Sequence, residues 1–166
     1  MKLIVIDVDG TLTDGSIYYT ENKIEIKKFN VKDAAGILAA QAVGIPCMIL
    51  TGRESYAVKR RAEDLKIQYV EQGVKDKLSY LDKFINEKGI GYSDVLYIGD
   101  DLNDLSAIRK CGYTACPFDA TEEIKDEVDY ISINKGGYGA VRDSIFHFLK
   151  IIGKYDEAIS LTYSGI

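Results

Sequence analysis

Short apolar runs alternate along the chain with segments in which apolar and charged residues recur at helical spacing. The apolar runs predict strands at 2–7, 45–50, 67–70, 95–98, 113–116 and 130–133. The helical spacing predicts helices over 32–43, 54–65, 75–88, 103–110 and 140–152. Residues 17–29 predict a β-hairpin that turns at Glu21 and Asn22. We expect residues 153–166 to form a flexible tail.

This alternation indicates an α/β fold: a three-layer, Rossmann-like, doubly wound parallel sheet with helices on both faces and right-handed crossovers. No repeat or linker divides the chain, so we expect one domain over 1–166, with the hairpin as a small flap. In such sheets ligands bind outside the carboxyl ends of the strands. Asp7, Thr51 and Asp100 each follow a different predicted strand, and the sequence therefore predicts that they meet in one crevice.

Asp7 and Asp9 stand two residues apart at the end of the first predicted strand, in Asp-Val-Asp-Gly-Thr-Leu. Two carboxylates this close repel each other unless a cation or a shared proton compensates them. A divalent cation with oxygen ligands would do so. The same pair suits phosphoryl transfer, with one Asp as nucleophile and the other exchanging protons. The alternative is an ordinary Asx turn at a strand end, and the motif alone does not decide between them.

Composition excludes several classes of function. Of the 166 residues 46% are hydrophobic and 28% charged, as in a soluble globular protein. The net charge of -5 argues against a nucleic-acid partner, and no apolar run reaches the roughly 20 residues that span a membrane. No signal peptide is visible and Cys47, Cys111 and Cys116 are expected as free thiols, so we predict a cytoplasmic protein. The only histidine, His147, is expected on a packed helix, which makes histidine-based catalysis a poor candidate.

Four motifs in order make the chain resemble the haloacid dehalogenase superfamily of phosphatases. They are Asp7-Val-Asp-Gly-Thr-Leu, Leu50-Thr-Gly-Arg, Lys77 at a helix start, and Gly99-Asp-Asp-Leu-Asn-Asp. The resemblance implies hydrolysis of a phosphate monoester through an aspartyl-phosphate on Asp7, with Asp9 as general acid and base. It also implies a Mg²⁺ cofactor held by the Asp7 carboxylate, the Asp9 backbone carbonyl and Asp100.

The same resemblance implies that Thr51, Gly52 and Lys77 stabilise the oxygens of the transferring phosphoryl group. It places Asp101 and Asp104 at outer positions, where they would orient Lys77 or metal-bound water. Plainer explanations exist for each position. The acidic residues of the fourth motif would also cap the next helix, Lys77 would also be an ordinary surface lysine, and Thr51-Gly52 an ordinary turn.

Too few residues separate the motifs for an inserted cap domain, so the chain resembles the capless class of the superfamily. In that class a neighbouring subunit covers the site, and we expect a homotetramer in which the hairpin roofs a neighbour's cleft. The chain is further similar to the 3-deoxy-D-manno-octulosonate 8-phosphate phosphatases over Lys27–Gly36, Arg53 with Arg61, Gln72-Gly73 and Gly136–Arg142. This similarity implies an eight-carbon keto-sugar acid phosphate as substrate, a role in lipopolysaccharide biosynthesis, and a tail that folds over the site.

Arg53 and Arg61 would hold the carboxylate of such a sugar acid, for which a guanidinium group is well shaped. Relatives that act on nine-carbon sugar acid 9-phosphates tend to carry Glu and Lys where this chain has Arg53 and Asp64, and this difference favours the eight-carbon substrate. The nine-carbon substrate remains an alternative. A phosphatase of broad specificity and a catalytically silent assembly domain are further alternatives.

Overall fold

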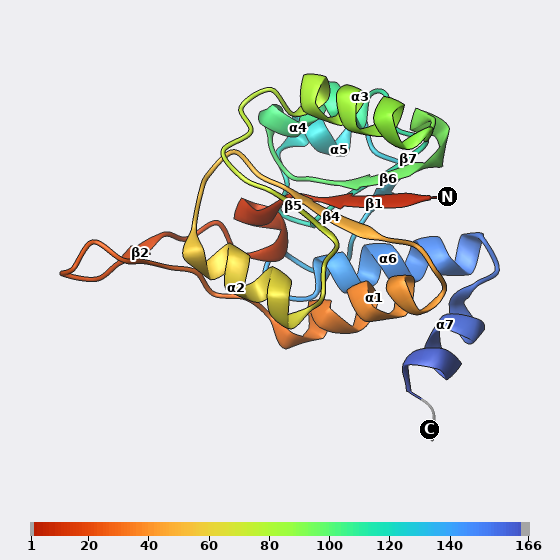
Figure 1. Ribbon diagram of the computed structural model, residues 1–166, viewed down its shortest axis with the longest axis horizontal. Coiled ribbons are helices and arrows are strands. Elements are labelled where there is room, and N and C mark those ends of the chain that lie inside the picture. The colour runs from red at the N-terminus through yellow and green to blue at the C-terminus, as the bar shows by residue number, and fades with distance from the viewer. Residues whose placement is uncertain (1, 164–166) are drawn as a thin grey trace.

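The computed structural model describes residues 2–163 as a six-stranded sheet between two layers of helices, with a hairpin projecting at one end (Figure 1). The strands of the sheet are β1 (Leu3–Ile6), β4 (Cys47–Leu50), β5 (Tyr69–Glu71), β6 (Val95–Ile98), β7 (Tyr113–Cys116) and β8 (Tyr130–Ile131). Their order is β5-β4-β1-β6-β7-β8, and every neighbouring pair is parallel. The predicted α/β fold with a parallel sheet is confirmed.

Helices cover both faces of this sheet (Figure 1). One face carries α1 (Val31–Ala42), α2 (Tyr56–Asp64) and α6 (Ala140–Ile151), and the other carries α3 (Lys77–Lys88), α4 (Leu102–Ile108) and α5 (Glu122–Lys125). On β1, Ile4 and Ile6 point into the first core, whereas Leu3 and Val5 point into the second. Burial on both faces explains why the strands appear in the sequence as uninterrupted apolar runs.

The predicted hairpin is present, although its paired strands are short. Strands β2 (Tyr18–Tyr19) and β3 (Glu25–Ile26) are antiparallel, with Tyr18 opposite Ile26. The turn lies at Glu21 and Asn22 as predicted, and Lys23 follows it in the left-handed region at a φ of 60°. Figure 1 shows the hairpin extending away from the helices and the sheet.

The predicted tail differs from the structure. Tyr155–Thr162 form helix α7, which packs on α1 and α6 and buries Ala158 completely. Figure 1 places α7 at the end of the molecule opposite to the hairpin, so this part of the chain does not fold over the carboxyl ends of its own strands. The last three residues of the predicted tail, 164–166, lie outside the described part. The sequence also gave no indication of α5 or of the 3₁₀ turn η2 (Tyr92–Asp94).

The order of the strands creates a crevice next to β1. The chain begins in the middle of the sheet, moves outward through β4 and β5, and returns to the other side of β1 with β6. A reversal of this kind separates the connections that follow neighbouring strands and leaves room for a ligand at their carboxyl ends. No helix within residues 2–163 has the length and apolar character needed to cross a membrane.

Candidate active site

The carboxyl ends of β1, β4 and β6 bring three distant segments of the sequence to one edge of the sheet. Ile6 is the last residue of β1 and is paired with both β4 and β6, so the segments after these strands emerge at the same level. The backbone N–H of Asp7 donates to the carbonyl oxygen of Ile98 at 2.9 Å. Asp7, Thr51 and Asp100 therefore all lie at the edge where the sequence placed them.

Three carboxylates and one ammonium group form the centre of this edge. One oxygen each of Asp7, Asp100 and Asp104 lie within 4.8 Å of one another. Lys77 Nζ lies 2.7 Å from Asp7 Oδ1 and 2.6 Å from Asp104 Oδ1, and the lysine side chain is fully buried. A buried lysine between two carboxylates excludes the plainer explanation, that Lys77 is an ordinary surface lysine.

Asp104 uses both of its carboxylate oxygens to hold its neighbours. Oδ1 accepts hydrogen bonds from Lys77 Nζ and from the Tyr97 hydroxyl at 2.7 Å, and Oδ2 accepts one from the Asp100 N–H at 3.2 Å. Asp104 thus has the position expected of a residue that orients Lys77. Asp101 does not have this position. Its exposed carboxylate accepts a hydrogen bond from the Leu102 N–H and caps the N-terminus of α4, as the alternative explanation of the motif predicted.

Burial and mutual repulsion change the acidity of these groups. Burial, and then the charge of Asp104, raises the pKa of Asp7 well above its ordinary value. Burial raises the pKa of Asp100 to about 7, against the opposing effect of the hydrogen bond from Thr11. Burial lowers the pKa of Lys77, but the charges of Asp7 and Asp104 outweigh it and the net direction is upward. Lys77 therefore keeps its charge beside Asp7, whose carboxyl group resists ionisation.

The donor atoms of this cluster suit a hard divalent cation. Three carboxylates converge on one ammonium group, so negative charge is in excess when all of them are ionised. A cation at Asp7 and Asp100 would balance that excess, and carboxylate oxygens are the ligands that Mg²⁺ prefers. The Asp9 carbonyl, the third ligand implied by the resemblance, belongs to the turn directly after Asp7. Asp104 is the less suitable ligand because hydrogen bonds already occupy both of its oxygens.

A tight turn, η1 (Val8–Leu12), carries the rest of the first motif past Asp100. Gly10 has a φ of +95°, and a Cβ at this position would lie 2.0 Å from Asp100 Oδ2. The hydroxyl of Thr11 donates to Asp100 Oδ1 at 2.6 Å. The loop before α6 closes over the same turn, and a Cβ at Gly136 would lie 1.7 Å from the Gly10 carbonyl oxygen. These close approaches explain the glycines of two separate motifs.

A chain of ion pairs connects Asp9 to the hairpin. Lys27, whose side chain is fully buried, pairs with Asp9 Oδ1, and its Nζ lies 3.0 Å from Glu25 Oε1. Glu25 Oε2 pairs with Arg53 at 2.7 Å, and Arg53 also donates to the Tyr19 hydroxyl at 3.2 Å. The guanidinium group that the sequence assigned to a substrate carboxylate is therefore held by residues of the hairpin.

The other predicted substrate residues lie in the loop after β4 and on α2. Thr51 is buried in the loop after β4, and its N–H donates to the Glu71 carbonyl at 3.0 Å. Gly52 follows it in this loop. Arg61, on α2, donates to the Asn30 carbonyl at 3.1 Å. Arg53 and Arg61 thus contact different parts of the segment 17–30.

Sequence reasoning missed three residues that the structure places in these networks: Thr11, Tyr97 and Lys27. Thr11 and Lys27 belong to motifs that the sequence singled out, but nothing in those motifs indicates their partners. Tyr97 lies among the apolar residues of β6, and its partner Asp104 comes from α4. No local pattern could have paired them.

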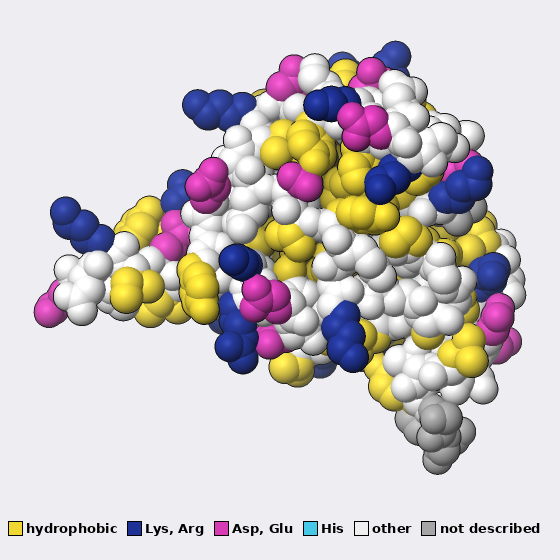
Figure 2. Space-filling model, in the orientation of Figure 1, with side chains coloured by type: hydrophobic (Ala, Val, Ile, Leu, Met, Phe, Trp, Pro, Cys, Tyr) yellow, Lys and Arg dark blue, Asp and Glu magenta, His cyan; other side chains and the backbone are white. Residues whose placement is uncertain are grey.

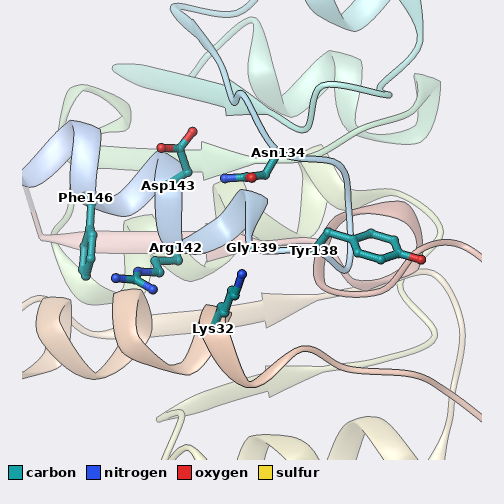
Figure 3. A pocket seen from close by; sticks show the side chains of 7 residues that line it. All are labelled: Lys32, Asn134, Tyr138, Gly139, Arg142, Asp143 and Phe146. Carbon is teal, nitrogen blue, oxygen red and sulfur yellow. The ribbon is translucent and has the colours of Figure 1, made fainter.

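A separate hollow lies beside the first turn of α6 (Figure 3). It is lined by Lys32, Asn134, Tyr138, Gly139, Arg142, Asp143 and Phe146. The carboxylate of Asp143 is engaged by the hydroxyls of Tyr130 and Ser132. None of the predicted catalytic or metal-binding residues lines this hollow, so it is not part of the candidate active site.

Comparisons with known proteins identify relatives with this arrangement of elements. A profile described as haloacid dehalogenase-like hydrolase matches residues 70–143. The 3-deoxy-D-manno-octulosonate 8-phosphate phosphatase KdsC of Escherichia coli (strain K12) is 37% identical over 158 residues, which cover 95% of this chain and 84% of that protein.

Two crystal structures extend this comparison. The Moraxella catarrhalis phosphatase of the same name, in complex with magnesium, phosphate and KDO, has a TM-score of 0.93 at 41% identity over 96% of this chain and 92% of its own. The cobalt-bound Haemophilus influenzae phosphatase has a TM-score of 0.88 at 35% identity, over 93% of this chain and 91% of its own.

Proposed function

The chain belongs to the family of 3-deoxy-D-manno-octulosonate 8-phosphate phosphatases, which are haloacid dehalogenase-like hydrolases, and we propose that it releases phosphate from that eight-carbon sugar acid phosphate. The observation that carries this proposal is the buried Lys77 bridge between Asp7 and Asp104, with Asp100 beside it. It gathers a carboxylate nucleophile, a fixed positive charge and oxygen ligands for a cation at one edge of the sheet. Phosphoryl transfer needs this combination, because its catalysis consists mainly of positioning and charge stabilisation.

In the proposed mechanism Asp7 attacks phosphorus and divides hydrolysis into two displacements. A bond forms between an Asp7 carboxylate oxygen and phosphorus while the bond from phosphorus to the sugar oxygen breaks, and Asp9 gives a proton to the departing oxygen. Asp9 then takes a proton from the water that hydrolyses the aspartyl-phosphate. Lys77, with the Thr51 hydroxyl and the Gly52 N–H, stabilises the remaining phosphoryl oxygens. Mg²⁺ bound at Asp7, Asp100 and the Asp9 carbonyl would supply the positive charge that the carboxylates leave uncompensated.

For the carboxylate of the sugar acid, Arg61 is a better candidate than Arg53. Arg53 would have to exchange Glu25 for the substrate, whereas Arg61 makes a single hydrogen bond within residues 2–163, to the Asn30 carbonyl, and has five N–H groups. Arg61 also lines a hollow at the base of the hairpin, together with Lys27, Phe29, Tyr56, Ala57, Arg60 and Asp64. Lys27, one of the residues that line this hollow, also pairs with Asp9.

We also propose that neighbouring subunits of a homotetramer cover the open site. The hairpin exposes Ile17, Tyr18, Tyr19, Ile24 and Ile26, each by 39–65%, and Figure 2 shows hydrophobic side chains along it. A two-stranded hairpin has no core of its own, and a contiguous exposed apolar surface marks an interaction site. Three further apolar residues after β6, β7 and β8 are exposed: Leu102 at the start of α4, Phe118 and Ile133. In the proposed tetramer the hairpin of a neighbouring subunit would cover these residues.

A cytoplasmic location is the proposal that best suits the cysteines. Cys47, Cys111 and Cys116 are free thiols, and burial raises the pKa of each to about 12. Thiols in this form are unreactive and are typical of a reducing compartment.

The test of the proposed activity is phosphate release from 3-deoxy-D-manno-octulosonate 8-phosphate, measured with and without Mg²⁺. A nine-carbon sugar acid 9-phosphate and an aryl phosphate serve as comparison substrates. We expect the eight-carbon ester to have the highest kcat/KM, and Asp7→Asn to lower kcat by about 10⁴-fold or more with an unchanged circular dichroism spectrum. A higher kcat/KM for the nine-carbon ester would favour that specificity, and no release from any ester by the folded protein would favour a silent assembly domain.

A further inference from the structure

Lys27 lies buried at the junction between the hairpin and the sheet. It follows β3 directly, and its side chain is fully inaccessible to solvent. A buried ammonium group is costly unless carboxylates pair with it, and two do so here: Asp9 through Oδ1, and Glu25 through Oε1 at 3.0 Å. The Asp9 side chain keeps 22% of its exposure, and its contact with Lys27 is made through Oδ1.

The contact with Lys27 decides which oxygen of Asp9 carries a proton. An ammonium group donates hydrogen bonds and accepts none, so Oδ1 is the acceptor toward Nζ, and the carbonyl oxygen of a neutral carboxyl group fills that role better than its hydroxyl oxygen. In the neutral carboxyl group the proton therefore sits on Oδ2. The same contact fixes the side-chain torsions of Asp9, and with them the direction in which this proton points.

We infer that Lys27 is a positioning residue for proton transfer, which holds Asp9 so that its Oδ2 proton faces the leaving group. This inference rests on the proposed function and adds a residue to it. As the bond from an Asp7 oxygen to phosphorus forms and the ester bond breaks, the proton moves from Asp9 Oδ2 to the departing sugar oxygen. That oxygen leaves as a neutral alcohol, and Asp9 becomes a carboxylate paired with Lys27.

Lys27 is itself held from a second side. Glu25 joins it to Arg53, which follows β4, so the ammonium group is fixed between the hairpin and the loop of the second motif. A lysine that only attached the hairpin to the sheet would have a different signature: its loss would disturb the whole site and slow every substrate alike. A lysine that positions the acid matters most for leaving groups that need a proton.

The experiment uses this difference between leaving groups. We compare kcat/KM of Lys27→Met and wild type for 3-deoxy-D-manno-octulosonate 8-phosphate, whose alkoxide needs protonation, and for 2,4-dinitrophenyl phosphate, whose phenolate leaves without a proton. The ratio kcat/KM includes only steps up to ester cleavage, so the later hydrolysis of aspartyl-phosphate does not contribute. We expect a loss of about 10²-fold for the sugar ester and of less than about threefold for the aryl ester.

Controls separate this role from damage to the fold. Lys28→Met is the matched control, because Lys28 is exposed and donates a hydrogen bond to the Tyr138 hydroxyl at 2.9 Å rather than to Asp9. This variant should keep the wild-type ratio of the kcat/KM values for the two esters. Lys27→Arg keeps a charged donor and should restore most of that ratio. Lys27→Gln keeps an uncharged amide donor and provides a second variant of intermediate effect if Lys27→Met does not fold. Asp9→Asn sets the scale for complete loss of the acid.

Because both esters are measured on one preparation, inactive protein cancels from their ratio. A large loss for the sugar ester alone, repaired by Lys27→Arg, supports the positioning role. Equal losses for both esters in Lys27→Met or Lys27→Gln would overturn it. Failure of the wild-type protein to hydrolyse either ester would instead overturn the proposed function, and this inference with it.

Discussion

Replacement of Asp100 by Asn should make the metal-free protein more stable above neutral pH. Burial raises the pKa of Asp100 from its ordinary 3.8 to about 7; the hydrogen bond from Thr11 opposes this rise and the charge of Asp104 adds to it. The ionised carboxylate therefore destabilises the folded state. Asn has nearly the same shape, and its Oδ1 can still accept the hydrogen bond that Thr11 makes at 2.6 Å, so the variant loses mainly the charge.

The sign and the size of the effect follow from proton linkage. An acid whose pKa is raised on folding contributes stability below its unfolded pKa, near 3.8 here, and this contribution is lost as the pH rises through about 7. At about 1.4 kcal/mol per pKa unit, the full difference corresponds to about 4 kcal/mol. Asp100 is not completely buried, so solvent screening reduces this upper value. We expect Asn to raise the free energy of unfolding by about 1–3 kcal/mol above neutral pH, and by progressively less in acid.

Urea unfolding in EDTA, followed by far-UV circular dichroism because the chain has no Trp, measures this difference at several pH values. Asp101→Asn is the matched control: Asp101 is an exposed N-cap, and Asn caps a helix as well as Asp does. Excess Mg²⁺ should stabilise the wild type and leave Asp100→Asn nearly unchanged. An Asp100→Asn protein less stable than wild type above neutral pH in EDTA would refute the reasoning.

Four further changes test other parts of the molecule. Gly136→Ala brings a methyl group within 1.7 Å of the Gly10 carbonyl oxygen, so kcat/KM for phosphate release should fall by about 10²-fold; the control Gly91→Ala, whose Cβ meets only Ser93 Oγ at 3.4 Å, should be harmless. Lys77→Met leaves Asp7 and Asp104 buried without their cation, and urea unfolding above neutral pH should show a loss of about 3–5 kcal/mol; a loss below about 1 kcal/mol would contradict the buried bridge. Deletion after Gly153 removes α7 with its buried Ala158 and should lower the melting temperature by about 4–8 °C, with kcat changed by less than about twofold; a large fall in kcat at unchanged stability would instead favour a tail that acts at the site. Replacement of Tyr18 and Ile26 by Ser should dissociate the proposed tetramer in light-scattering measurements, and a variant that stays tetrameric would contradict the role of the hairpin.

The central strands could be predicted from the sequence because strands buried on both faces leave uninterrupted apolar runs. β4 and β6 lie within the predicted ranges, and the hairpin turns at the predicted residues. Helix α7 was missed because its short sequence buries only Ala158, and its partners on α1 and α6 come from distant parts of the chain. A helix stabilised mainly by such contacts leaves a weak local pattern.

The candidate site shows the same division. The sequence placed Asp101 and Asp104 together, three residues apart at a helix start, and assigned them one role. In the structure the direction of α4 turns Asp104 toward Lys77 and leaves Asp101 in solvent. The sequence also assigned Arg53 and Arg61 to one substrate carboxylate. In the structure their side chains contact different parts of the segment that contains the hairpin.

The sequence alone determined the alternation of strands and helices and the positions of Asp7, Thr51 and Asp100 after strand ends, because local periodicity and local turn chemistry encode both. Only the tertiary structure decided which charges are buried together. Lys77 meets Asp7 across 70 residues of chain and Lys27 meets Asp9 across 18. The physical reason is that an ion pair depends on distance in space and on burial, and residue spacing along the chain reports neither.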